Sequence, residues 1–126
     1  MKKTIYLILI TALLTACATP ISPAAESVQS FLKALSDKND ALLLTTVCAD
    51  YEFDALLEFD SFALVQTTLN DLDCQQTGIS GKDALVICNG SIEASYGNEV
   101  RSFDLSERTY RVVKTGGDWL VCGYTK

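Results

Sequence analysis

The chain has 126 residues, a formal net charge of −6 and no histidine. Without histidine it contains neither a Ser-His-Asp or Cys-His catalytic arrangement nor a histidine-ligated metal centre. The excess of acidic residues repels nucleic acid and anionic lipid headgroups, so neither is an expected ligand.

The first 16 residues have the composition of a secretory signal peptide. Lys2 and Lys3 supply the positive start, and an apolar run from Ile5 to Leu14 follows them. This run is shorter than the roughly 20 apolar residues that a membrane-spanning helix needs, which argues against an uncleaved anchor. We therefore expect residues 1–16 to be removed as a signal peptide.

The sequence Leu14-Thr15-Ala16-Cys17 resembles the lipobox of bacterial lipoproteins, in which the cysteine becomes the lipidated first residue. The resemblance implies acyl chains such as palmitate on Cys17 and a lipid anchor on the extracytoplasmic side of the cell membrane or the outer membrane. Because each buried methylene contributes about 0.8 kcal/mol, several chains anchor a protein where one does not. Plain secretion after Ala16 or Ala18 is the alternative, although it gives Cys17 no purpose.

Cleavage before Cys17 leaves 110 residues, the size of one domain. Loss of the two signal lysines leaves 8 basic and 16 acidic residues, a formal charge of −8. Four more cysteines remain, and an even number in an extracytoplasmic protein predicts two disulfide bonds. A zinc site is the alternative, but no pair has CxxC spacing, so we expect no metal and no cofactor. The four are Cys48, Cys74, Cys88 and Cys122.

Residues 17–24 are predicted to form a lipidated tether, followed by a single domain over 25–126. Ser22 is a candidate N-cap and Pro23 suits the first helical position. A first amphipathic helix is indicated by apolar residues at i, i+3, i+4 and i+7, namely Val28, Phe31, Leu32 and Leu35.

A second helical segment, Ala41 to Phe62, has an interrupted apolar period. We expect two short helices with a joint near Cys48 to Asp54, and Asp40 as the cap of the first.

Strand patterns begin after Phe62 and predict four strands. The turn signals between them are Thr77–Asp83, Gly97-Asn98 and Gly116-Gly117. The apolar parity of the third strand shifts between Leu105 and Tyr110, which predicts a bulge there. In an alternative interpretation, Asn89-Gly90 is itself a hairpin and divides the second strand. The four strands are Val65–Gln76, Ala84–Ser95, Glu99–Lys114 and Trp119–Thr125.

The strand layout chooses one of the three possible cysteine pairings. Cys74 and Cys88 lie seven residues on either side of Gly81, near the centre of the first hairpin, so they should face each other across the ladder. Cys48 is then left to pair with Cys122 and to join the helices to the last strand.

Helices followed by antiparallel strands predict an α+β fold, with the N-terminal helices packed on a curved four-stranded antiparallel sheet. At this point the chain resembles the nuclear-transport-factor-2-like superfamily, whose first helix lies in a bent, cone-shaped sheet. The opening helix Ala25–Leu35 and the ending made of Tyr110–Lys114, Gly116–Trp119 and Leu120–Cys122 carry the resemblance. It implies membership of an uncharacterised subgroup of small extracytoplasmic lipoproteins.

Enzymes of this superfamily, of ketosteroid-isomerase and dehydratase type, place carboxylates and tyrosines inside the cone. The resemblance therefore makes a few residues candidates for such chemistry, although we interpret the acid-rich segment from Asp50 to Asp60 mainly as the solvated face of the helical arm. Members that rely on histidine are excluded. The candidates are Asp50, Tyr51, Glu52, Asp54 and Asp104.

Four aromatic residues are candidates for lining a ligand pocket: Trp119, Tyr110, Phe103 and Tyr124. Ordinary core packing is the alternative for each. We expect a non-enzymatic, membrane-anchored binding module for a small apolar ligand or an envelope protein. Two other classes stay open: a structural subunit that forms a homodimer through its sheet face, and an isomerase-like or dehydratase-like enzyme.

Overall fold

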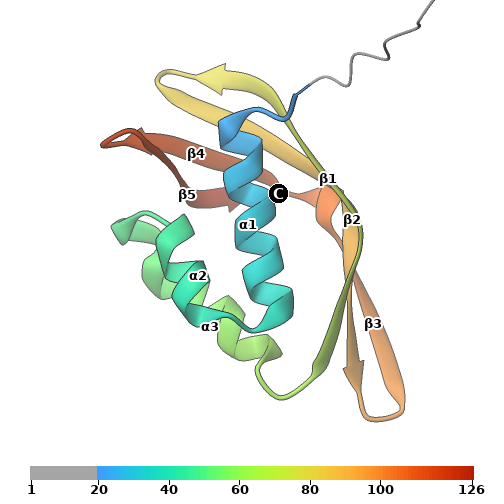
Figure 1. The fold of residues 1–126 in the computed structure, drawn as a ribbon. Helices are drawn as coiled ribbons and strands as arrows, with labels where there is room; N and C mark the ends of the chain where they lie inside the picture. Colours follow the sequence, from blue (N-terminus) through green and yellow to red (C-terminus); the bar gives the residue numbers. More distant parts are fainter. Residues whose placement is uncertain (1–19) are drawn as a thin grey trace, which may run out of the picture.

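The computed structural model describes residues 20–126, so the signal segment and Cys17 lie outside the described residues. Three α-helices precede an antiparallel sheet that curls around them (Figure 1). The sheet has five strands in the order β1-β2-β4-β5, and β3 pairs with β2 beside β4. This arrangement confirms the predicted α+β cone, with one strand more than expected.

Helix α1 (Pro23–Asp37) begins where the sequence predicts. The Ser22 hydroxyl accepts a hydrogen bond from the Ala25 amide at 3.2 Å, and Pro23 occupies the first turn. The helix ends at Lys38, whose left-handed backbone lets its amide bond back to the last carbonyls. The apolar stripe of α1 is fully buried against the sheet: Val28, Phe31, Leu32 and Leu35.

The expected joint separates α2 (Asp40–Thr46) from α3 (Glu52–Phe62) and contains a short 3-10 turn, η1 (Ala49–Tyr51). The predicted cap is wrong by one residue: the Asn39 side chain, not that of Asp40, accepts the capping hydrogen bond from Leu42. An Asn side chain at the N-cap reaches the amide three residues on, whereas Asp40 is already inside the helix.

The first hairpin joins β1 (Gln66–Ser80) to β2 (Asp83–Tyr96). Its turn is only Gly81-Lys82, because Ser80 pairs directly with Asp83. The predicted seven-residue turn segment is therefore mostly strand.

The predicted third strand is two strands, β3 (Glu99–Asp104) and β4 (Thr109–Thr115), separated by a 3-10 turn, η2 (Leu105–Glu107). Both lie along the same edge of β2 in the same direction. Four residues, 105–108, face three residues of β2, 88–90, so one extra residue is inserted. The predicted shift in apolar parity is therefore present. The extra residue lies in the 3-10 turn η2, which interrupts the predicted strand, and not in a bulge within it. The last strand, β5 (Asp118–Thr125), follows the Gly116-Gly117 turn.

Asn89-Gly90 is a bend of β2, not a hairpin. The β1 register shifts at the same level, between Asn70 and Asp73, and Asp71 has a positive φ of 52°. Gly90 has a φ of 107°, and a Cβ there would lie 2.8 Å from the Asp71 carbonyl oxygen. Only glycine fits this close approach, which lets the sheet fold over the helices.

Both disulfide bonds have the pairing expected from the sequence. Cys74 and Cys88 are directly opposed in the β1–β2 ladder, with Cα atoms 4.0 Å apart. Cys48, just after α2, is bonded to Cys122 of β5. Beside this bond, Val47 forms a parallel bridge with Val121, and the Cys48 amide donates to the Val121 carbonyl at 3.0 Å.

Candidate functional site

An ion pair between Glu58 of α3 and Arg108, just before β4, lies partly buried between the helices and the sheet. The Arg108 Nη1 and Glu58 Oε1 atoms are 2.5 Å apart. The guanidinium also lies over the ring of Tyr124, 4.1 Å from its centroid, and donates to the Tyr110 hydroxyl at 3.4 Å. The Arg108 side chain thus links α3 to Tyr110 of β4 and to Tyr124 of β5.

Burial controls the ionisation of this cluster. For Arg108, burial opposes the charged form, but the Glu58 carboxylate and Tyr110 together more than offset it and raise the pKa of the guanidinium. Burial raises the pKa of Tyr110 to about 12, against the lowering effect of Arg108. Burial, helped by the nearby Glu58 charge, also raises the pKa of Tyr51. Both phenols therefore stay neutral and able to donate hydrogen bonds.

A surface pocket of about 540 Å³ opens above this cluster, between α3 and the end of β5. Its size lies in the range of small-molecule sites, which hold roughly 300–1,000 Å³. Since Arg108 neutralises Glu58, the exposed carboxylates of Asp50 and Asp54 give the rim a net negative charge. The lining residues are Asp50, Tyr51, Asp54, Glu58, Arg108, Cys122, Gly123 and Tyr124.

The chemistry of this pocket suits a cationic or hydrogen-bond-donating group: two free carboxylates stand at the rim, and aromatic rings lie below. Within residues 20–126, no group of three acidic or cysteine side chains could hold a metal ion.

The candidate catalytic residues do not converge inside the cone. Asp50, Glu52 and Asp54 are exposed on the helical arm, and Tyr51 alone is buried. Asp104 is exposed at the start of η2, where the Ser106 hydroxyl and amide donate to it and hold its pKa below the usual value.

The four aromatic candidates lie in three places. Tyr110 and Tyr124 are neighbours, with ring centroids 5.8 Å apart, and Tyr110 is fully buried in the core. Phe103 packs edge-on against Phe62 at 5.6 Å. Trp119 lines a different groove, so the four do not form one pocket.

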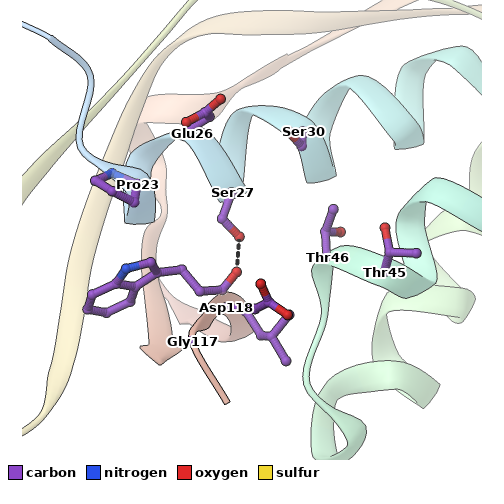
Figure 2. A pocket seen from close by; sticks show the side chains of 10 residues that line it. Pro23, Glu26, Ser27, Ser30, Thr45, Thr46, Gly117 and Asp118 are labelled. Atoms are coloured by element: carbon purple, nitrogen blue, oxygen red, sulfur yellow. Dashed lines mark hydrogen bonds between the residues drawn. The ribbon is translucent and has the colours of Figure 1, made fainter. Parts of the chain in front are cut away.

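That second groove, of about 510 Å³, lies between α1, α2 and the β4–β5 turn. Figure 2 shows Ser27 and Ser30 of α1 on one side and Thr45 and Thr46 of α2 on the other. The Ser27 hydroxyl donates to the Trp119 carbonyl oxygen at 2.7 Å, which ties α1 to β5. The Thr45 and Thr46 hydroxyls instead donate to the Leu42 and Leu43 carbonyl oxygens, so they stabilise α2 itself and do not link it to a neighbouring element.

Sequence reasoning missed the central ion pair. A usable signal existed: Asp50, Asp54 and Glu58 are spaced four residues apart, which puts them on one face of a helix. No local pattern indicated that Arg108 would meet the last of these.

The first 18 residues match a model described as the prokaryotic membrane lipoprotein lipid attachment site. This protein is a membrane-anchored lipoprotein. Its anchor is a lipid, and no helix in the described part of the chain has the length and apolar character to cross a membrane. No curated protein matches the lipoprotein.

Among solved structures, the lipoprotein is similar to a proposed ketosteroid isomerase from Shewanella frigidimarina. The TM-score is 0.55 at 16% sequence identity, covering 82% of this chain and 95% of the other. The likeness confirms the nuclear-transport-factor-2-like fold and, at this identity, shows the fold alone.

Proposed function

We propose that the protein is a non-enzymatic binding module of the cell envelope, and that the face of helix α3 takes a basic protein partner. One domain, residues 25–126, would do the binding, held on the extracytoplasmic side by lipid on Cys17 and the 17–24 tether. The observation that carries the proposal is a pair of exposed apolar side chains, Phe53 and Leu57, beside the acidic pocket.

Phe53 is 72% exposed and Leu57 54% exposed. Because they lie four residues apart on α3, the two side chains share one face. Asp54, next to Phe53 in the sequence, lines the pocket with Asp50. A partner that places an apolar side chain on Phe53 and Leu57 could put a lysine or arginine into the pocket, where the Asp50 and Asp54 carboxylates would receive it.

A small apolar ligand is less well supported than a protein. Large side chains fill the described cone: Phe31, Leu32 and Tyr110 are fully buried between α1 and the sheet. The pocket above them is rimmed by carboxylates, which an apolar molecule would desolvate without compensation.

Support for an enzyme is also weaker. An acid–base residue of the isomerase type needs a carboxylate in an apolar site. The exposed Asp50 and Asp54 lack that environment, and Glu58 is held by Arg108.

A homodimer through the sheet is the other alternative. On the outer sheet face Leu85, Ile87 and Val113 are only partly buried. A dimer of the purified protein at micromolar concentration would favour this alternative.

Photo-crosslinking tests the α3 face directly. The full lipidated protein would carry a photoreactive phenylalanine analogue at Phe53, and a control protein would carry it at Val100 on β3, which is 62% exposed. We expect one discrete protein adduct from position 53 and none from position 100. Absence of an adduct at 53, or equal adducts at both positions, would contradict the proposal.

The charge requirement is tested in the same format. Asp54→Lys reverses a charge at the pocket, whereas Glu93→Lys reverses an exposed charge on β2. We expect only Asp54→Lys to abolish the adduct at position 53. If both variants abolished the adduct, the change in net charge would explain the loss, and a specific role of Asp54 would be contradicted.

A further inference from the structure

The anchor is short compared with the domain it holds. Cys17 lies three residues before Pro20, where the described structure begins. Three fully extended residues span at most about 11 Å, and a compact domain of this size has a radius of gyration of about 13 Å. The domain therefore cannot turn freely above the bilayer, and the end that carries Pro20 must face it.

The first described residues lie against the sheet. Pro20, Ile21 and Ser22 line a pocket with Gln29 of α1 and with residues 73–76 of β1. In Figure 1 the described residues just before α1 and the tip of the β1–β2 hairpin lie at the same end of the molecule. The β2–β3 hairpin lies at the opposite end.

The tip of the β1–β2 hairpin carries an unusual side chain. Ile79, one residue before the strand end, is 71% exposed although it shares a face of the ladder with the buried Ala84. Lys82 is exposed in the turn itself, and Ile21, just before α1, is also exposed. An exposed apolar residue three positions from an exposed lysine is typical of segments that lie at the boundary between headgroups and acyl chains.

We propose that the β1–β2 hairpin tip is a second membrane contact: Ile79 inserts into the bilayer leaflet that holds the acyl chains of Cys17. Lys82 then lies at the level of the headgroup phosphates. The hairpin and the lipid hold the domain at two points, so it stands in one orientation. This inference does not depend on the proposed partner of helix α3.

The charge of the protein sets the conditions for this contact. The acidic domain is repelled by an anionic surface, and one isoleucine is too weak to bind an untethered domain. The lipid on Cys17 removes that difficulty, because it keeps the hairpin at high effective concentration next to the bilayer. The contact should therefore form in zwitterionic vesicles and depend on the anchor.

The single tryptophan of the chain makes the test simple. In the full lipidated protein, Trp119→Phe removes the native indole, and Ile79→Trp or Val100→Trp supplies a new one at a matched, exposed strand position. Each variant is reconstituted into phosphatidylcholine vesicles with brominated or ordinary acyl chains. We expect Ile79→Trp emission to shift to shorter wavelength and to be quenched by bromine, and Val100→Trp emission to do neither.

Two more probes keep the result decisive. Ile21→Trp, next to the anchor, checks the reconstitution, and Lys82→Trp replaces Ile79→Trp if that variant does not fold. Equal quenching at positions 79 and 100, or quenching at position 21 with none at the hairpin, would overturn the proposal. Shielding of position 79 only when a soluble envelope protein is added would overturn it as well, in favour of a protein contact.

Discussion

Arg108 is a cation shared by three partners: the Glu58 carboxylate, the Tyr124 ring and the Tyr110 hydroxyl. The same residue types in solvent would contribute little to stability, because exposed ion pairs are worth only about 0–1 kcal/mol. Here the pair is partly buried, so each charge depends on the other for its solvation. The sequence could suggest the carboxylate face through the spacing of Asp50, Asp54 and Glu58, but a contact across 50 residues leaves no local pattern.

Two buried tyrosines, Tyr110 and Tyr51, make the stability of the fold sensitive to alkali. Since burial raises the pKa of Tyr110 to about 12, against about 10 for an unfolded tyrosine, the folded state resists deprotonation. The stabilisation is fully present below pH 10 and is lost as the pH rises from about 10 to 12. Tyr51, whose pKa is also raised by burial, adds to the effect in the same direction.

We therefore predict that Tyr110→Phe flattens the fall of the melting temperature between about pH 10 and pH 12. Circular dichroism melting at several pH values measures this slope. Tyr96→Phe, on an exposed strand end, is the control and should keep the slope of the parent protein. Identical slopes for all three proteins would show that Tyr110 does not titrate on unfolding.

Among the elements, β2 does the most to shape the cone. Its first half pairs with β4 and its second half with β3, while β1 runs along its other edge. Both neighbours break register where β2 bends at Gly90. The sequence shows an Asn-Gly dipeptide there, which is also the signal of a hairpin. The pairing of β2 with distant residues, such as Asn70 of β1 on one edge and Asp104 of β3 on the other, makes this segment a bend and not a turn.

Gly90→Ala should therefore be unusually costly. A methyl group would meet the Asn70 and Asp71 carbonyl oxygens, and the positive φ adds strain, so we expect a loss of about 2–3 kcal/mol in the free energy of unfolding. Denaturant unfolding gives the value. Gly97→Ala is the matched control: its φ is also positive but the space around it is open, so we expect about 1 kcal/mol. Equal losses would mean that φ alone matters and that the close approach does not.

For the whole molecule, the sequence predicted the architecture better than its details. The α+β order, the cysteine pairing and the start of α1 followed from period, turn dipeptides and symmetry about Gly81. The break at Leu105–Glu107 did not follow, because a parity shift reports one inserted residue but not how the backbone accommodates it. The sequence also did not show that the four aromatic candidates lie in three separate places, since residue type does not indicate which end of the cone a strand residue occupies.

The two disulfide bonds should contribute unequally. The Cys48–Cys122 bond closes a loop with a sequence separation of 74 and the Cys74–Cys88 bond one of 14. Loop entropy then gives about 4.4 and 3 kcal/mol. We expect the Cys48→Ala/Cys122→Ala protein to melt at a lower temperature than the Cys74→Ala/Cys88→Ala protein, with both below the parent. If the Cys74→Ala/Cys88→Ala protein melted at the lower temperature, the hairpin bond would contribute more to stability than the long-range bond, and loop entropy would not explain the order.

The Val47–Val121 bridge also determines how copies of the protein behave beside one another. Edge strands offer unpaired amides and carbonyls that recruit further strands. On β5 that position is occupied by the chain's own Val47 and Cys48, and on β1 the irregular register at Asp71 interrupts the row. Lipoproteins confined to one leaflet meet in two dimensions and in similar orientations, which favours edge-to-edge growth into fibres. The bridge covers one position of the β5 edge and the register shift interrupts the β1 edge, so both edges offer fewer unpaired groups to a neighbouring copy.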